Sequence, residues 1–172
     1  YWGTWYQGIA KTNKAIDCLR QYGQMSDEDK ARLEAEIKFV RASLYFDLMK
    51  RYKEIIIYDE NLQAYTKDKA YSTEKEGWDF VYNDLKFAAD NLPAKEAANG
   101  RINKGMAWAF MTRAMLYAER WDVVKTAAEE VEKLGYGLEE NYADSYSVAI
   151  GSGNNEAIIQ YQFDRANDVT HS

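Results

Sequence analysis

The chain has 172 residues, enough for one domain that buries about 70% of its unfolded surface and folds without disulfides or a structural metal. Apolar residues make up 47% and charged residues 29%, an ordinary globular balance, and the net charge is −6. Nucleic-acid binding requires a concentrated basic face, whereas the lysines and arginines here are mixed with acids, so the charge pattern argues against a nucleic-acid partner.

The first predicted element is a helix over residues 2–22, in which Trp5, Ile9 and Ile16 recur at multiples of three and four residues before Gly23 ends it. The chain opens on this spacing with no signal peptide, which indicates a piece that begins inside a domain. No apolar run reaches about 18 residues, so no membrane-spanning segment is expected. The single cysteine, Cys18, cannot form an internal disulfide, and we expect a buried or half-buried thiol.

The second predicted helix covers residues 26–52, with Ser26 as its N-cap and acids in its first turn. Its apolar stripe has steps of three and four residues: Leu33, Ile37, Val40, Leu44 and Leu48. In its C-terminal half a second face becomes apolar as well: Ala42, Tyr45, Phe46 and Met49. A helix that is apolar on two sides is covered on two sides, so we expect this half to lie between neighbouring helices.

An extended connection is predicted over residues 54–71, and its length is more often functional than idle. Thr73 and Glu76 then fit a capping box for a third helix, which ends before Pro93. A polar loop over residues 94–103 follows.

The fourth helix is predicted over residues 103–120, and a fifth begins near Trp121 and stops at Leu134. Gly135 and Gly137 offer left-handed positions after the fifth helix. Residues 157–163 alternate well enough for a short strand.

Two nearly identical words, RASLY at residues 41–45 and RAMLY at residues 113–117, stand on the second helix of each of two predicted helix pairs. Trp5 and Trp78 open the first helices of those pairs and are offset by nearly the same distance, and Trp121 opens the fifth helix in the same way. The chain therefore reads as two helical hairpins and the start of a third.

Within the two words, the small residues Ala42 and Ala114 allow close helix approach, and Tyr45 and Tyr117 are expected to fill the space to the neighbouring pair. The prediction is an all-α fold: a tetratricopeptide-like α-α superhelix of helix pairs, with a short strand-like C-terminal segment. We expect the two words to be structural and to touch no ligand.

The order of several segments resembles the SusD/RagB family of outer-membrane nutrient-binding lipoproteins. The segments that carry the resemblance are WYQGIAKTNKAID, EIKFVRASLYFDLMKRY, VYNDLKFAADNLP, GRINKGMAWAFMTRAMLYAERWDVVKTAAEEV and NNEAIIQYQF. They cover nearly the whole chain, and their order and spacing are more specific than any one of them. Residues 1–172 are therefore expected to form a single SusD-like helical domain that belongs to a longer chain.

The resemblance implies a location and a partner. Members of this family are tethered by lipid to the surface of Gram-negative outer membranes, where they cover a TonB-dependent, SusC-like transporter and hand it oligosaccharides or, in some branches, peptides. The implied function is nutrient binding without catalysis and without a cofactor. Membrane contact would come only through a lipid anchor that this chain lacks.

Sugar recognition uses flat aromatic faces, on which pyranose C–H bonds stack, with amide or carboxylate groups nearby for the hydroxyls. The start of the chain and the long connection could supply these groups, so the candidate ligand-binding residues are Tyr1, Trp2, Tyr58, Asp59, Asn61, Tyr65 and Tyr71. The alternative is that Trp2 is core and that the tyrosines pack the loop onto the helices.

Catalysis has little support. His171 is the only histidine and stands next to the last residue, so zinc sites and Cys/His chemistries are excluded and no metal site is expected. Sequence-adjacent acids such as Asp59 and Glu60 are expected to be solvated, not placed across a cleft as in a glycosidase. A helical-repeat protein-interaction scaffold without its own small-molecule ligand is the alternative function, and glycoside hydrolysis is the third.

Overall fold

The computed structural model describes residues 2–61, 69–94, 100–146 and 156–159. These residues form five α-helices and one short 3-10 helix: α1 (Trp2–Tyr22), α2 (Asp27–Met49), α3 (Glu74–Asn91), α4 (Lys104–Tyr117), α5 (Trp121–Lys133) and η2 (Tyr142–Tyr146). No strand is present among them, so the all-α prediction is confirmed. Ala157, Ile158 and Ile159 are not in a strand, and the rest of the strand predicted at 157–163 lies outside the described residues.

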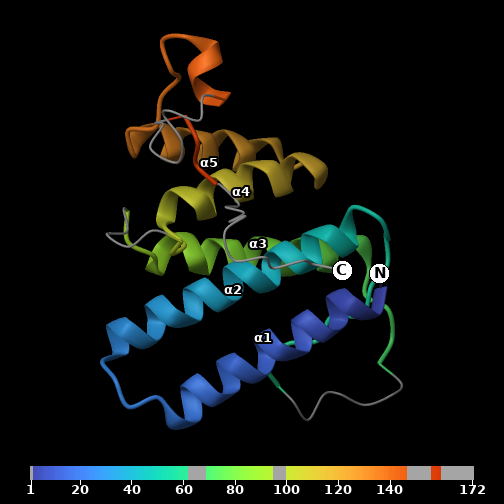
Figure 1. The fold of residues 1–172 in the computed structure, drawn as a ribbon. Coiled ribbons are helices and arrows are strands. Elements are labelled where there is room, and N and C mark those ends of the chain that lie inside the picture. Colours follow the sequence, from blue (N-terminus) through green and yellow to red (C-terminus); the bar gives the residue numbers. More distant parts are fainter. Residues whose placement is uncertain (1, 62–68, 95–99, 147–155, 160–172) are drawn as a thin grey trace, which may run out of the picture. The chain divides into compact units, whose positions relative to one another are not determined.

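Consecutive α-helices pack against each other from α1 to α5, and Figure 1 shows them stacked in chain order. Helix α2 contacts both α1 and α3. In its C-terminal half, Arg41 bonds to Asn13 of α1 and to Asp84 of α3, which confirms that this half lies between neighbours. The helices therefore form the pairs α1–α2 and α3–α4, with α5 beginning a third, as the repeat predicted.

The chain divides into two compact units, residues 1–134 and 135–172. All five α-helices belong to the first unit. In the second unit the backbone N–H of Glu139 donates to the Glu156 carboxylate at 3.2 Å, and η2 lies between these two residues in the sequence. No helix in the described ranges is long and apolar enough to cross a membrane.

Helix ends follow local sequence signals. The Ser26 hydroxyl accepts the Asp29 N–H at 3.1 Å, and Thr73 and Glu76 form the predicted capping box. Helix α1 ends at Tyr22, directly before Gly23. After α5, Gly135 adopts the left-handed conformation with φ 80°, whereas the prediction for Gly137 was wrong, because its φ is not positive.

The two predicted apolar faces of α2 differ in burial. In the long stripe Leu48 is fully buried but Val40 is 42% exposed, whereas the residues of the second face are all buried, as predicted: Ala42, Tyr45, Phe46 and Met49. Their spacing of three and four residues defines a face rotated away from Val40, because α2 must present apolar side chains to both α1 and α3. Ala42 and Ala114 are both fully buried, as expected for close helix approach.

The two five-residue words do not have the same environment. Arg41 and Tyr45 are buried, whereas Arg113 is exposed and Tyr117 is 54% exposed despite an edge contact with Phe46 at 5.3 Å. Tyr117 therefore reaches the neighbouring pair at Phe46, as expected, but leaves more than half of its surface exposed and fills that space only in part. Tyr45 is covered by the connection that follows α2, but Tyr117 is the last residue of α4 and leads directly into the turn to α5.

The tryptophans that open the helices also differ in burial. Trp78 is buried, Trp5 is half-buried under the Arg51 guanidinium at 4.6 Å, and Trp121 is 63% exposed. Equal spacing in the sequence therefore marks equivalent positions in the array without giving them equal burial.

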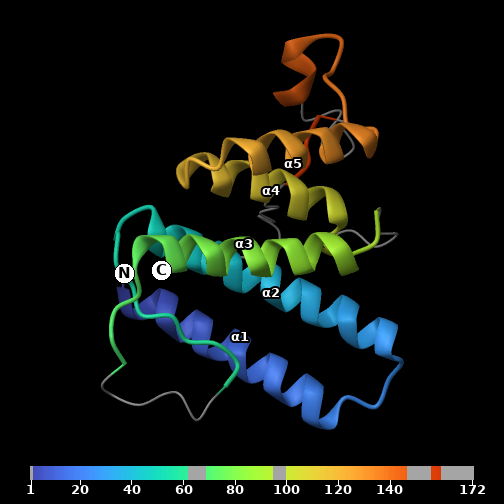
Figure 2. The same ribbon diagram turned by 180° about the vertical axis from the view of Figure 1, so that it is seen from behind.

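The connection between α2 and α3 is extended where it is described, as predicted. Ile55 is fully buried, and its carbonyl accepts both the N–H and the hydroxyl of Ser72 at 2.7 Å. Figure 2 shows the described part of the connection running beside α1. This placement makes the segment one wall of a groove whose other wall is α1.

Candidate functional site

A groove of about 410 Å³ lies between the first turns of α1 and the extended segment that follows α2. The described residues that line it are mostly apolar or aromatic: Trp2, Gly3, Tyr6, Gln7, Ala10, Ile56 and Tyr58. The α1 members share one helix face, because residues four apart lie above one another. The groove thus combines aromatic rings with one amide side chain, Gln7.

The aromatic rings support one another. The Trp2 ring centre lies 4.9 Å from that of Tyr6 and 4.7 Å from that of Tyr52, which it meets edge-on. The Tyr6 and Tyr58 rings meet edge-on at 5.9 Å. Edge contacts of this kind favour fixed ring orientations, so the groove has its aromatic surfaces in place before any ligand arrives.

The Tyr6 hydroxyl ties the two walls together. It donates to the Ile56 carbonyl and accepts the Ile56 N–H, both at 2.9 Å. Burial raises the pKa of Tyr6 to about 12, so the hydroxyl stays protonated at neutral pH and keeps both bonds. Because its hydroxyl is fully used, Tyr6 offers a ligand its ring only.

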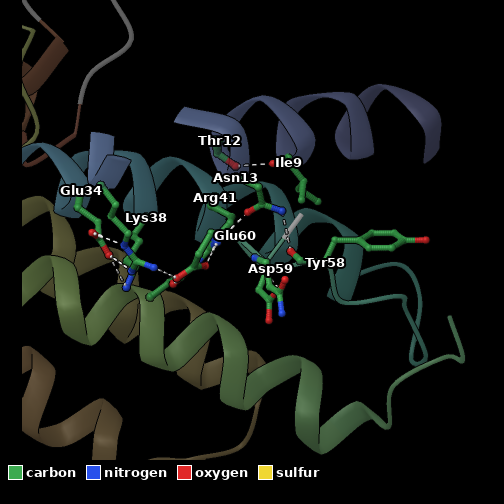
Figure 3. Close-up of polar contacts among 12 residues, drawn as sticks. Ile9, Thr12, Asn13, Glu34, Lys38, Arg41, Tyr58, Asp59 and Glu60 are labelled. Carbon is green, nitrogen blue, oxygen red and sulfur yellow. Dashed lines mark hydrogen bonds and ion pairs between the residues drawn. The ribbon is translucent and has the colours of Figure 1, made fainter. Parts of the chain in front are cut away.

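A buried network of hydrogen bonds and ion pairs is centred on Arg41, next to the extended segment, and is shown in Figure 3. Its Nε and Nη2 donate to the two oxygens of Asp84 at 2.7 and 2.8 Å, and its Nη1 donates to Asn13 Oδ1 and to Glu60 Oε2, both at 2.7 Å. The network joins α1, α2, α3 and the connection. Arg41 is only 2% exposed, so these partners replace its hydration.

The network extends toward the surface through Glu60, which also pairs with Arg20 at 3.0 Å. Arg20 in turn holds Glu34, which pairs with Lys38 at 3.0 Å. Burial alone would raise the pKa of Glu60, but the hydrogen bond and charge of Arg41, helped by Arg20, lower it to about 2. The expectation that Glu60 is a solvated acid was therefore wrong: it is a partly buried ion-pair partner.

Arg41 and Asp84 are both charged at neutral pH. Burial would lower the pKa of Arg41, but the hydrogen bonds and charges of Asp84 and Glu60 outweigh it and raise that pKa. Burial raises the pKa of Asp84, although the two short bonds from Arg41 oppose this and require an ionised carboxylate. The network is therefore a structural element in which each buried charge faces a partner of opposite charge.

Of the predicted ligand-binding residues, Trp2 and Tyr58 come together in the groove. Asp59 instead accepts the Asn61 N–H at 3.0 Å, a local turn contact, and Tyr71 is exposed; neither of these two nor Asn61 lines the groove. Tyr1 and Tyr65 lie outside the described residues.

Tyr6 and Gln7 were missed as site residues. The signal that could have found Tyr6 is helical spacing, since a position four residues after Trp2 shares its face. Gln7 lies four residues after Gly3, which has no side chain that would point to a site. The thiol of Cys18 is half-buried, as predicted. Among the described residues no group of His, Cys, Asp and Glu could hold a metal ion.

A second groove, of about 850 Å³, lies at the start of α3 and the α4–α5 turn. Its lining is more polar: Lys53, Glu74, Lys75, Trp78, Asp79, Tyr117, Ala118, Glu119 and Arg120. Asp79 already pairs with Lys75 at 2.7 Å and with Arg120 at 2.5 Å. These pairs occupy groups that a ligand would need, so the aromatic groove beside α1 is the better candidate binding site.

Known proteins are similar to this chain in sequence and in fold. Residues 1–116 match the SusD-like family described as "starch-binding associating with outer membrane". A "SusD-like protein" of Bacteroides ovatus is 23% identical over 177 residues, which cover 94% of this chain and 32% of that protein.

Two solved structures extend the likeness. The crystal structure of a SusD-like protein from Bacteroides fragilis is 31% identical, with a TM-score of 0.83, over 95% of this chain and 33% of the other. A "laminarin binding SusD-like protein" is 25% identical, with a TM-score of 0.78, over 88% of this chain and 35% of the other. The chain thus spans about one third of the length of these relatives.

Proposed function

This chain belongs to the SusD-like family, and on that premise we propose that it is a cell-surface glycan-binding subunit that captures oligosaccharides in the groove beside α1. It passes them to a partner TonB-dependent outer-membrane transporter. The observation that carries the proposal is that Trp2, Tyr6 and Tyr58 line one groove together with the Gln7 amide.

The chemistry of the groove suits a sugar. Aromatic faces attract the C–H face of a pyranose ring, and the exposed Gln7 amide both donates to and accepts from hydroxyl groups. Ala10 and Ile56 supply the apolar remainder of the lining.

We expect the ligand to be neutral. No charged side chain is among the described residues that line the groove; Lys69 Nζ stands outside that set, 5.5 Å from the centre of the Tyr58 ring. A neutral glucan brings hydroxyls only, which suits a lining of aromatic rings and one amide. The relative described as laminarin binding is consistent with such a ligand.

Capture needs no bond breaking. The protein acts by stacking and hydrogen bonding, and weak contacts to several sugar units add up on a polysaccharide. The full-length protein is expected to be held at the outer membrane of a Gram-negative bacterium by a lipid anchor, beside a SusC-like transporter.

Affinity electrophoresis in gels that contain laminarin, starch or xyloglucan tests the proposal. We expect retardation by at least one neutral glucan and an increase in its dissociation constant of about tenfold or more in Trp2→Ala, because a principal stacking surface is lost. Trp121→Ala is the matched control, since Trp121 is exposed and outside the groove. The proposal is contradicted if Trp2→Ala and Trp121→Ala lose the same amount of glycan affinity, or if no polysaccharide retards the unmodified protein.

A protein-interaction scaffold is the second candidate. The observation that favours it is the exposure of three large apolar side chains near the α4–α5 turn: Leu116, Tyr117 and Trp121. Failure of all polysaccharides and of a peptide pool to bind would favour this function.

A further inference from the structure

The buried hydroxyl of Tyr45 holds the main chain of Tyr58. Tyr45 Oη accepts the Tyr58 N–H at 2.7 Å and donates to the Tyr58 carbonyl at 2.9 Å. Tyr45 is fully buried and does not line the groove. One side chain therefore satisfies both polar main-chain groups of a residue that forms the groove wall.

Asn13 provides a second, independent anchor. Its Nδ2 donates to the same Tyr58 carbonyl at 2.9 Å, while its Oδ1 accepts from Arg41 at 2.7 Å. The bond from Arg41 fixes which way the amide points, because the guanidinium can only donate. Asn13 is also fully buried and outside the groove lining.

The chain is fixed again two residues later, where Glu60 pairs with Arg41. Anchors at Ile56, Tyr58 and Glu60 leave the extended segment little freedom to move. Figure 3 shows the Tyr58 ring projecting away from the Arg41 network, so the anchors hold the main chain while the ring stays available.

We propose that Tyr45 and Asn13 are positioning residues of the binding groove, which hold Tyr58 as its second wall without touching the ligand. The effect on glycan affinity rests on the proposed function; the effect on the Tyr58 main chain does not. The RASLY word thereby takes part in binding indirectly, through its terminal tyrosine.

The second word provides an internal control. Tyr117 holds the equivalent place in RAMLY, but it is more than half exposed, and its hydroxyl has no hydrogen bond to any residue in the described part of the chain. The positioning role belongs to Tyr45 because a connection lies over it, not because of the word itself.

The test compares Tyr45→Phe with Tyr117→Phe by amide hydrogen exchange and laminarin titration. In Tyr45→Phe we expect exchange at the Tyr58 amide to accelerate about tenfold or more relative to core amides of α3 such as Val81. The laminarin dissociation constant should rise about three- to tenfold, the effect of losing one or two net hydrogen bonds. Tyr117→Phe should change neither quantity.

Unchanged exchange at Tyr58, a uniform acceleration at all amides, or faster exchange at Tyr58 with unaltered laminarin affinity would each overturn the positioning role. If Tyr45→Phe does not fold, Asn13→Asp replaces it, because it removes the donor to Tyr58 and keeps an acceptor for Arg41. If the unmodified protein binds neither laminarin, starch nor xyloglucan, the proposed function fails, and the exchange data still decide whether Tyr45 fixes Tyr58.

Discussion

Arg41 and Asp84 form a two-point ion pair between α2 and α3, with both side chains almost completely buried and with N–O distances of 2.7 and 2.8 Å. Removing one partner leaves a buried charge without compensation, whereas removing both leaves an apolar contact. This asymmetry allows the pair to be tested as a unit.

Arg41→Met should lower the free energy of unfolding by about 3–5 kcal/mol, because Asp84 remains buried and unpaired. The double variant Arg41→Met/Asp84→Leu should recover part of that loss and not all of it, because Asn13 and Glu60 still lose the Arg41 guanidinium. Urea unfolding of the two single variants and the double variant measures the coupling. Additive losses would show that the pair does not act as a unit.

Glu60 should make part of the stability depend on pH. Its pKa falls from an ordinary 4.5 to about 2 in the folded protein, so folding favours the ionised form. The stabilisation is complete above pH 4.5 and disappears as the pH falls through about 2.

Glu60→Gln should therefore cost on the order of 2 kcal/mol at pH 7, with partial exposure of the side chain taken into account. The difference from the unmodified protein should shrink as the pH falls from 4.5 toward 2. Urea unfolding at several pH values checks this, and Asp59→Asn is the control because Asp59 has no ion pair among the described residues. A pH-independent difference would assign the loss to something other than ionisation.

Ala42→Trp and Ala114→Trp should each destabilise the fold by about 1–3 kcal/mol, because both alanines are fully buried where helices meet. Thermal unfolding measures the effect, and Leu116→Trp, at an exposed position of α4, is the control. Unaltered melting temperatures in both alanine variants would contradict the close packing of the helix pairs.

Thr73→Ala removes the N-cap of α3 and the partner of Glu76, and should cost about 1 kcal/mol. Thr126→Ala, on the exposed face of α5, is the matched control and should be neutral within about 0.5 kcal/mol. Chemical denaturation of both variants distinguishes a capping effect from a general preference for alanine.

Helices and their ends could be predicted because their signals are local. The Ser26 cap, the Thr73–Glu76 box and the extended connection each depend on residues within a few positions. The family resemblance and the repeat together predicted the helix pairs. The long stripe failed at Val40, while the second predicted face of α2 is buried throughout. A helix between two neighbours has two apolar faces, and the sequence does not say which of them is covered best.

The candidate site was only partly predictable. Trp2 and Tyr58 could be named from their chemistry, but Tyr6 joins them through a contact 50 positions along the chain. Glu60 looked like a surface acid because its partner Arg41 lies on another element and no local pattern pairs them. Long-range polar contacts of this kind depend on the packed arrangement of α1, α2 and the connection.

The hydroxyls of Tyr6 and Tyr45 bind the extended segment at main-chain atoms, those of Ile56 and Tyr58. A hydrogen bond to a peptide N–H or carbonyl is indifferent to the side chain that the residue carries. The side chains at Ile56 and Tyr58 can therefore be substituted without losing the hydrogen bonds that fix the path of the chain. The hydroxyls that fix the backbone of the groove therefore act independently of the side chains at residues 56 and 58 that line it. New glycan selectivities can be engineered, or can evolve, at these side chains while the backbone stays unchanged.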